Sequence, residues 1–380
     1  MANMIDYLDW RGDISLRHSP FNEVDNLILS NLSYGRFGGI VPSPAESGLC
    51  LLPAAAAAHA ANGPYEVLKF DALSPEYLPR MLEKMAKCPR FATAALSDFV
   101  ACTDLELEMQ FAALTVHLED GTIFVSFRGT DDSLVGWKED FNLSFMDTVP
   151  SQKEAVRYLE AVAAKYPRRP ILVGGHSKGG HLAVYAAVNA RKSVRKRIRQ
   201  VYNNDGPGFN ADFYTQEGYI ELDKSIITLV PESSVVGMLM EHDNDYQVVR
   251  STDKGLWQHV AFGWEVLGTA FVPEEEADPD AKVYNQTIRE WLAAMTHEQR
   301  HDFIEAVYAL LTAGGDIDDL QDFKVEKTKS AVSLVKSFGT MDKTTRKVLF
   351  DMMELLAKQG VKVVKSELNL RQKLEKILER

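Results

Sequence analysis

The feature that most constrains this chain is a serine between glycines, placed between a short apolar run and a helix-like segment. The pentapeptide Gly175-His-Ser-Lys-Gly179 follows Ile171-Leu-Val173 and precedes Gly180-His-Leu-Ala-Val-Tyr-Ala-Ala187. A short apolar run of this kind is typical of a buried parallel strand. In that context the Gly-x-Ser-x-Gly pattern predicts an abrupt strand-to-helix turn, which presents the Ser177 hydroxyl at the edge of a sheet.

The turn also indicates chemistry at Ser177. A helix that begins directly after the serine places free N–H groups and its positive dipole end beside the hydroxyl, where they can stabilise an oxyanion. Short Gly-Ser patterns also shape ordinary loops. Here the expected strand before the pentapeptide, the expected helix after it and the additional Gly180 favour a nucleophile at Ser177.

Strand and helix patterns alternate around this motif. Phe111–Leu118 and Thr122–Phe127 are joined by a turn that contains Asp120-Gly121, which predicts a β-hairpin. A helix is expected over Gln152–Lys165. Further strands are expected around Val201-Tyr202, at Ile226–Val230 and at Tyr246–Val249. This alternation predicts an α/β fold with a mostly parallel central sheet flanked by helices.

An acidic, proline-bounded stretch, Pro273–Asp280, divides the chain. We expect an α/β domain with an N-terminal extension over residues 1–272, and a linker followed by a helical region over residues 273–380. Thr296-His-Glu-Gln299 fits a capping box before an apolar-periodic helix, and Lys347–Arg380 has amphipathic spacing. The sequence therefore predicts a C-terminal helical appendage.

Composition excludes several classes of protein. The 380 residues carry a net charge of −12, which argues against a nucleic-acid partner. No apolar run approaches the roughly 18 residues that a membrane-spanning helix needs, and the first residues lack the basic region of a signal peptide. The three cysteines, Cys50, Cys88 and Cys102, have no paired spacing, so we expect reduced thiols. We expect a cytoplasmic protein without stable membrane insertion, and the sequence leaves its oligomeric state open.

A serine nucleophile needs a histidine base and an acid that orients it, and in this fold the acid precedes the histidine. His259 is the first choice, because it follows the strand expected at Tyr246–Val249 and a loop could return it to the sheet edge. His242 is the alternative. We expect structural or solvated roles for the other downstream histidines, His181, His297 and His301.

Two residues are candidates for the acid. Glu232 lies directly after the apolar strand expected at Ile226–Val230, which is where such an acid belongs, and it is preferred. Asp205 follows the preceding strand and is the alternative. Because it stands before Gly206, Asp205 could also be an ordinary turn residue.

Several of these motifs occur together as they do in a known family. Phe127-Arg-Gly-Thr130, Trp137, Asp140 and Gly175–Gly180 resemble the class 3 lipases and a bacterial branch of lipase-like α/β hydrolases. The resemblance covers roughly Gln110–Val266 and implies the α/β-hydrolase fold. A serine, a histidine and an acid can carry out acyl transfer by themselves, so we expect no metal or organic cofactor.

The resemblance implies roles for further residues. Backbone N–H groups of Thr130 and Lys178 would form the oxyanion hole, and Ser133–Phe141, with Trp137 and Asp140, would correspond to the lid of the fungal members. Lys178 stands where the family commonly has leucine, and Glu232 where it usually has aspartate. Lys138 and Glu139 make the lid-like segment polar, so we do not infer interfacial activation.

The sequence thus predicts a serine esterase or lipase that acts through an acyl-enzyme, with Ser177, His259 and Glu232 as its triad and a small ester or a lipid as its substrate. Two alternatives stay open. One is a catalytically silent hydrolase fold used for protein interaction, since fold does not fix function. The other is a peptidase or acyltransferase that uses the same triad.

Overall fold

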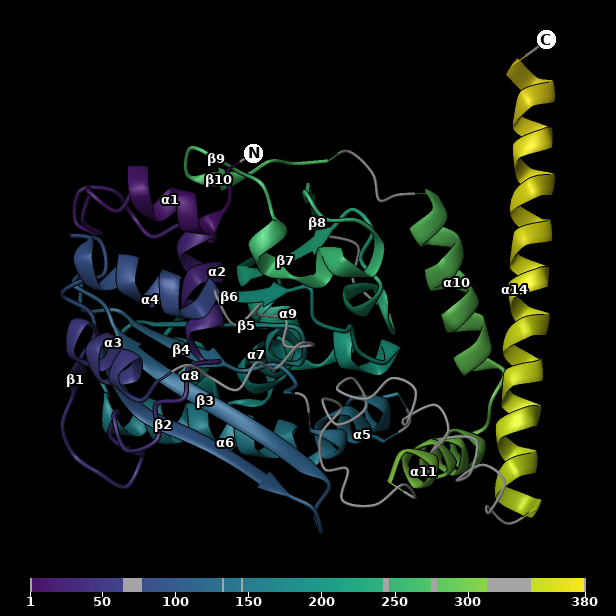
Figure 1. Cartoon of the computed structure of the whole chain (residues 1–380), viewed down its shortest axis with the longest axis horizontal. Coiled ribbons are helices and arrows are strands. Elements are labelled where there is room, and N and C mark those ends of the chain that lie inside the picture. The colour runs from purple at the N-terminus through teal and green to yellow at the C-terminus, as the bar shows by residue number, and fades with distance from the viewer. Residues whose placement is uncertain are drawn as a thin grey trace.

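The computed structural model describes residues 2–63, 77–131, 133–144, 146–241, 246–274, 279–312 and 343–378. Its centre is an eight-stranded sheet whose strands lie side by side in chain order (Figure 1). The strands are β1 (Cys50–Leu51), β2 (Ala95–Asp104), β3 (Met109–His117), β4 (Ile123–Phe127), β5 (Ile171–His176), β6 (Ile198–Asn204), β7 (Ile226–Pro231) and β8 (Tyr246–Val249). Strands β1 to β4 pair antiparallel and β4 to β8 pair parallel, which confirms the expected α/β-hydrolase fold.

Helices cover both faces of the sheet. One face packs against the N-terminal helices α1 (Met4–Trp10), α2 (Glu23–Leu32), α3 (Leu52–Ala61) and α4 (Tyr77–Lys87). The other face packs against α6 (Pro150–Lys165), α7 (Lys178–Asn189) and α9 (Glu217–Leu222), and the short α8 (Lys192–Arg195) follows α7. The helix α5 (Leu134–Asn142) lies beyond the end of β4, and a small hairpin of β9 (Val266–Leu267) and β10 (Ala270–Phe271) follows β8.

The alternation of β4 shows how one strand serves both layers. Phe124 packs in the core under the N-terminal helices, whereas Val125 and Phe127 pack in the core under α6 and α7. All three side chains are fully buried. Because successive side chains of a strand point to opposite faces, a strand buried on both sides reads as a continuous apolar run, as this one does.

A buried ion pair ties the N-terminal extension to the domain. Arg90 and Asp25 have fully buried side chains, and the Arg90 Nε–H donates to Asp25 Oδ1 at 2.6 Å. The other Arg90 nitrogens donate to the backbone carbonyls of Ile14, Ser19 and Pro20, each at 3.1 Å, and one of them also donates to Asp25 Oδ2. The guanidinium therefore fixes the irregular segment between α1 and α2.

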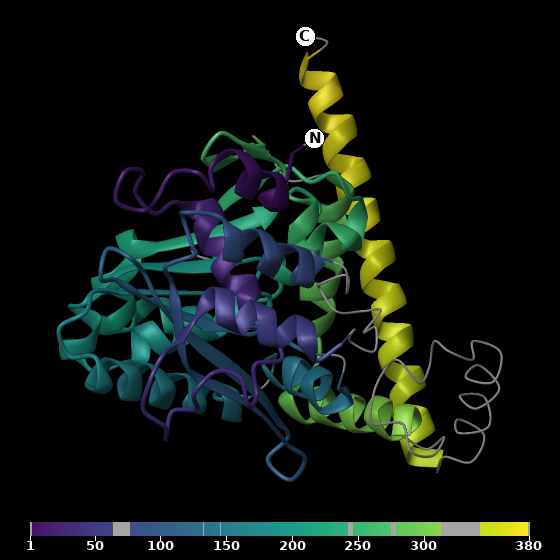
Figure 2. The ribbon, with the colours of Figure 1, turned by 60° about the vertical axis from the view of Figure 1, so that its left-hand side comes forward.

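The C-terminal region is helical, as expected. It contains α10 (Pro279–Ala293), α11 (His297–Thr312) and α14 (Lys343–Leu378), and α14 runs along one side of the molecule (Figures 1 and 2). Trp291 on α10 donates through its indole N–H to the carbonyl of Met352 on α14 at 2.9 Å. The capping box at Thr296 and Gln299 begins α11, with hydrogen bonds of 2.9 and 3.2 Å.

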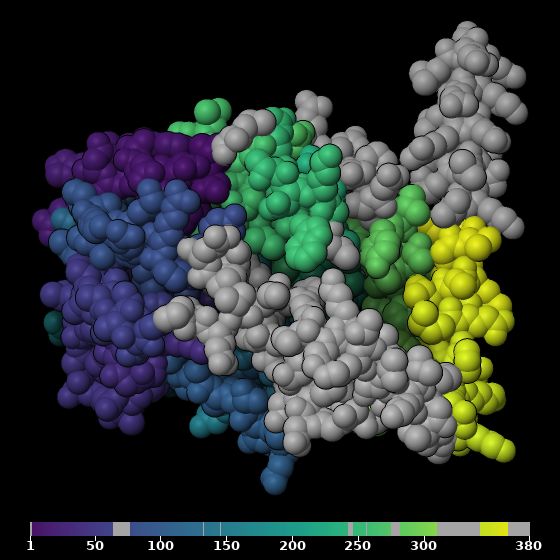
Figure 3. Space-filling model, in the orientation of Figure 1, coloured from purple at the N-terminus to yellow at the C-terminus, as the bar shows by residue number. Residues whose placement is uncertain are grey.

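These C-terminal helices also contact the α/β part of the chain. Asn285 on α10 donates to the carbonyl of Ser234 at 2.7 Å, and Arg300 on α11 donates to the carbonyl of Ser144. Figure 3 shows the N-terminal segments, in purple and blue, at one end of the molecule and the described part of α14, in yellow, at the other. Residues 275–278 of the acidic stretch lie outside the described residues, and the domain boundary at residue 273 stays a prediction. Within the part of the chain that is described, none of the helices has the length and apolar character needed to cross a bilayer.

Candidate active site

Ser177 occupies the turn between β5 and α7. Its φ is +58° and its ψ is −136°, a region that residues other than glycine rarely adopt and that costs free energy to hold. The flanking glycines are required by close packing. A β-carbon on Gly175 would lie 2.2 Å from the carbonyl carbon of Gly179, and one on Gly179 would lie 2.2 Å from the carbonyl oxygen of Phe127. The structure thus has the strand-turn-helix geometry that the motif predicts, and Ser177 is 9% exposed.

A buried aspartate holds the histidine beside this turn. His259 Nδ1 lies 2.6 Å from Asp205 Oδ2, and Asp205, at the end of β6, is completely buried. The second carboxylate oxygen of Asp205 accepts a hydrogen bond from the Ser234 hydroxyl. The backbone N–H of Gly237 donates to that hydroxyl at 3.0 Å, which orients it toward the carboxylate. Both carboxylate oxygens therefore have partners.

The preferred acid, Glu232, does not contact His259. Its Oε1 accepts a hydrogen bond from Gln258 Nε2 at 3.0 Å, and Gln258 Oε1 in turn accepts from the backbone N–H of Ser233 at 2.6 Å. Gln258 and His259 are neighbours in a short 3₁₀ helix, Gly255–His259, yet they bind the ends of different strands. The prediction of Glu232 as the partner of the histidine is therefore wrong, and the alternative, Asp205, occupies that place.

A second histidine supports the loop that carries His259. The ring of His176, directly before the serine, lies 4.7 Å from the ring of His259, and its Nε2 lies 2.8 Å from the His259 carbonyl oxygen. Because a carbonyl only accepts, Nε2 carries the hydrogen, so Nδ1 accepts from the Tyr34 hydroxyl at 3.3 Å. Burial, aided by the nearby His259, holds the pKa of His176 well below its ordinary value, and the ring stays neutral.

These contacts place the His259 imidazole beside the serine turn. Among the described residues the Ser177 hydroxyl makes no hydrogen bond, to His259 or to any other side chain. Hydrogen bonds of this kind are often long in a free enzyme and tighten when substrate binds. Transfer of a proton from Ser177 to His259 belongs to the proposed function.

Gly129, the residue before Thr130, lies against the serine turn, where a side chain would not fit. A β-carbon on Gly129 would lie 3.0 Å from that of Ser177 and 2.7 Å from the carbonyl oxygen of His176. The backbone N–H groups of Thr130 and Lys178 make no hydrogen bond to any described residue. These two N–H groups are therefore available to a ligand, and their role as an oxyanion hole stays a prediction.

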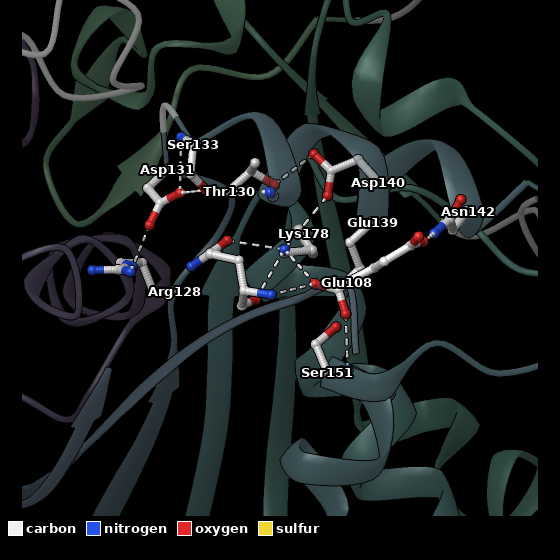
Figure 4. A network of polar contacts seen from close by, with 12 residues as sticks. Glu108, Arg128, Thr130, Asp131, Ser133, Glu139, Asp140, Asn142, Ser151 and Lys178 are labelled. Atoms are coloured by element: carbon white, nitrogen blue, oxygen red, sulfur yellow. Dashed lines mark hydrogen bonds and ion pairs between the residues drawn. The ribbon is translucent and has the colours of Figure 1, made fainter. Parts of the chain in front are cut away.

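The side chain of Lys178 lies in a buried polar network (Figure 4). Its ammonium, on a residue that is 1% exposed, donates to Glu139 Oε2 at 2.9 Å and to the side-chain and backbone oxygens of Gln110 at 2.9 and 3.1 Å. Glu139 is completely buried and also accepts from the backbone N–H of Gln110 at 3.1 Å and of Ser151 at 2.9 Å. Glu139 and Gln110 were not expected as members of the site. A lysine where the family has leucine is the signal in the sequence that could have found them.

The next acid along α5, Asp140, binds Thr130. Its Oδ2 accepts from the Thr130 hydroxyl at 2.5 Å, and its Oδ1, which is buried, lies 3.7 Å from the Lys178 ammonium. Burial raises the pKa of Asp140 to about 6, and the Lys178 charge opposes that rise. Asp140 thus connects the lysine to the proposed oxyanion donor.

The lid-like segment is a part of this network. It forms α5, which buries Glu139 and holds Lys138 between Glu108 at 2.7 Å and Glu305 of α11 at 2.6 Å. Trp137 is 38% exposed on its outer side. The segment is thus a helix that ion pairs join to its neighbours, with the Trp137 ring on its surface.

Besides His259, three described histidines follow the serine in the chain. His181 stacks on Phe209 at 4.1 Å and lies with its Nε2 2.8 Å from Gln152 Nε2, which agrees with a structural role. His297 and His301 belong to α11, where His301 is exposed and lies 3.5 Å from Asp302. His242, the alternative base, lies outside the described residues.

The strained serine between β5 and α7, the sheet order and the histidine loop after β8 together define an α/β-hydrolase fold. Residues 85–309 match the family model described as Mbeg1-like, and the chain belongs to the Mbeg1-like family. No curated protein matches the chain.

Solved structures of fungal lipases show a distant likeness. The Rhizomucor miehei lipase in its propeptide complex is 20% identical with a TM-score of 0.31, over 42% of this chain and 57% of that one. The Lip2 lipase of Yarrowia lipolytica is 16% identical with a TM-score of 0.31, over 41% and 65%. The lipase of Rhizopus microsporus var. chinensis is 18% identical with a TM-score of 0.33, over 53% and 72%. The chain thus spans less than two thirds of the first two lipases, and likeness at this level carries no argument about activity.

Proposed function

We propose that this protein is a serine hydrolase that cleaves carboxylic esters through an acyl-enzyme. The observation that carries the proposal is the hydrogen bond of 2.6 Å between His259 and the buried Asp205, beside a serine held at φ +58°. A buried aspartate bonded to Nδ1 fixes the imidazole with its Nε2 free of hydrogen, which is the form that can accept a proton from a hydroxyl.

In the proposed reaction Ser177 loses its proton to His259 Nε2 as its oxygen bonds to the ester carbonyl carbon. The electron pair of the carbonyl moves to its oxygen, where the N–H groups of Thr130 and Lys178 donate to it. His259 then gives the proton to the alcohol oxygen as the C–O bond breaks. Water repeats the sequence and releases the acid, while Asp205 stabilises the imidazolium in each half.

The choice of an ester rests on the chemistry of this set. A serine, a histidine and an oxyanion hole suffice for an activated acyl group, and they need no metal or redox partner to balance the reaction. The polar α5, with Lys138 and Glu139 both paired, favours water-soluble or short-chain esters over an aggregated lipid surface. We include the outward Trp137 in the proposed substrate wall, since it is an exposed aromatic side chain of α5, as Phe141 also is.

Labelling of the whole protein with a fluorophosphonate probe tests the proposal. We expect the wild type to be labelled at Ser177 and the Ser177→Ala variant to stay unlabelled while unfolding at the same temperature. Chromogenic esters of graded chain length, measured beside a peptide panel and with added acyl acceptors, then identify the acyl group and the acceptor. A folded wild type that the probe does not label would contradict the proposal and favour a silent scaffold for protein interaction.

A further inference from the structure

Lys178 is the residue whose placement the proposed reaction does not explain. Only its backbone N–H has a part in that reaction, yet its side chain carries a full positive charge into the interior. Burying an ammonium costs several kcal/mol unless partners compensate it. An apolar side chain would fill the same space without that cost, so the charge needs a reason of its own.

Within the described residues, the partners of the ammonium lie on two elements. Gln110 belongs to β3, and Glu139 and Asp140 are successive residues of α5. The Glu139 carboxylate accepts three hydrogen bonds, from Lys178 and from two backbone N–H groups, so its position is fixed. Because these hydrogen bonds hold Glu139 on α5, they also fix the position of the next residue, Asp140.

The charge of the Asp140 carboxylate determines the direction of its hydrogen bond with Thr130. An ionised carboxylate only accepts, so the Thr130 hydroxyl must donate to Asp140 Oδ2, at 2.5 Å. The second oxygen, Asp140 Oδ1, is buried without a hydrogen bond among the described residues and faces Lys178 Nζ at 3.7 Å. The lysine charge, together with the Thr130 hydroxyl, favours the ionised form of that carboxylate.

The charges around Asp140 act in opposite directions. Burial, Glu139 and Asp131 raise its pKa, to about 6, whereas Lys178 and the Thr130 hydroxyl lower it. Without the ammonium the carboxyl would take up a proton more readily. A protonated carboxyl can donate to the Thr130 oxygen instead of accepting from it, and the threonine would no longer be held in one orientation.

We infer that Lys178 is a positioning residue: its buried ammonium fixes Asp140, and through it Thr130, in the orientation in which the Thr130 N–H faces the oxyanion. This inference rests on the proposed function. It assigns to the side chain after the nucleophile a task that an apolar side chain cannot perform, because an apolar side chain carries neither charge nor donor.

A double-mutant cycle on the full chain tests the inference. Lys178→Gln removes the charge but keeps an amide donor for Glu139, and Thr130→Val removes the hydroxyl but keeps the backbone N–H. If the lysine acts through that hydroxyl, the two changes share one effect and do not add. We expect each to slow both fluorophosphonate labelling and ester hydrolysis by about tenfold, and the pair to be slower by about the same factor as Thr130→Val alone.

A paired lysine on another helix provides the matched control. Lys165, the last residue of α6, has its ammonium 2.6 Å from the buried carboxylate of Asp98, and among the described residues no hydrogen bond or ion pair joins it to Asp140 or Thr130. We expect Lys165→Gln to react within about twofold of the wild type. Thermal unfolding of every variant, measured in parallel, separates a loss of rate from a loss of folded protein. If the combined variant is slower by the product of the two single effects, or if Lys178→Gln reacts like the wild type, the inference is overturned.

If the proposed function itself is wrong, the labelling experiment gives a different result. In that case the folded wild type itself is not labelled, and the catalytic role of Lys178 is withdrawn with it. A labelled wild type with additive variants overturns the role of Lys178 alone.

Discussion

Asp205 and His259 are joined by a hydrogen bond of 2.6 Å between Oδ2 and Nδ1, although 54 residues separate them in the chain. The aspartate side chain is completely buried and that of the histidine is 20% exposed. A carboxylate cannot donate, so the hydrogen lies on Nδ1 and Nε2 is left as an acceptor. This relationship gives the imidazole the tautomer that a general base requires.

The first prediction concerns the acid. Asp205→Asn should lower kcat for a chromogenic ester by roughly 10³- to 10⁴-fold, because the asparagine amide can donate to Nδ1 and favour the wrong tautomer. Glu232→Gln should stay within about threefold of the wild type, since Glu232 binds Gln258 and not His259. Steady-state kinetics of both variants at one pH provide the comparison, and thermal unfolding controls for folding. A Glu232→Gln variant that is slower than Asp205→Asn would show that Glu232, and not Asp205, is the acid that assists His259.

The second prediction concerns the buried pair Arg90 and Asp25. Arg90→Met should lower the free energy of unfolding by about 3–5 kcal/mol, because it leaves the Asp25 carboxylate buried without its cation. Arg90→Met with Asp25→Asn should recover part of that loss, since no unpaired charge remains. Urea denaturation followed by fluorescence measures both variants. A loss below about 1 kcal/mol for the single variant would show that the pair does not hold the N-terminal extension in place.

The third prediction concerns the pH dependence of stability. Burial lowers the pKa of His117 from 6.5 to about 4, and its Nε2 lies 2.8 Å from the hydroxyl of Ser97. Between these two values the unfolded chain binds a proton at this site that the folded chain does not bind. The free energy of unfolding should therefore be fully retained above pH 6.5 and fall as the pH drops toward 4.

His117→Gln isolates this contribution. We expect the wild type to lose roughly 1–2 kcal/mol more than the variant between pH 7 and pH 4.5, after allowance for the partial exposure of the ring. Urea denaturation at the two pH values measures the difference, in which the carboxylates common to both proteins cancel. Equal losses in the two proteins would mean that His117 is protonated as readily in the folded state.

The sequence predicted the order of strands and helices well, because that order depends on local patterns of residues. The apolar run before Ser177, the Asp120-Gly121 turn and the helix over Gln152–Lys165 each carry their signal within a few residues, and the structure has β5, the β3–β4 hairpin and α6 at these places. Strand β2 was not predicted. A register shift between Ser97 and Val100 interrupts its alternation, so the period of two is lost there.

The sequence by itself determined that Ser177 stands at a strained turn, because only glycines fit on either side where the backbone of α7 meets β4 and β5. Only the tertiary structure decided which acid meets His259. Glu232 and Asp205 both follow strands that end at the same edge, and the 3₁₀ helix at Gly255–His259 turns Gln258 to one and His259 to the other. Contacts of this kind depend on how a distant loop is oriented, which no local pattern of residues records. The buried charges around Lys178 have the same origin, since β3, α5 and α7 come together only when the chain is folded.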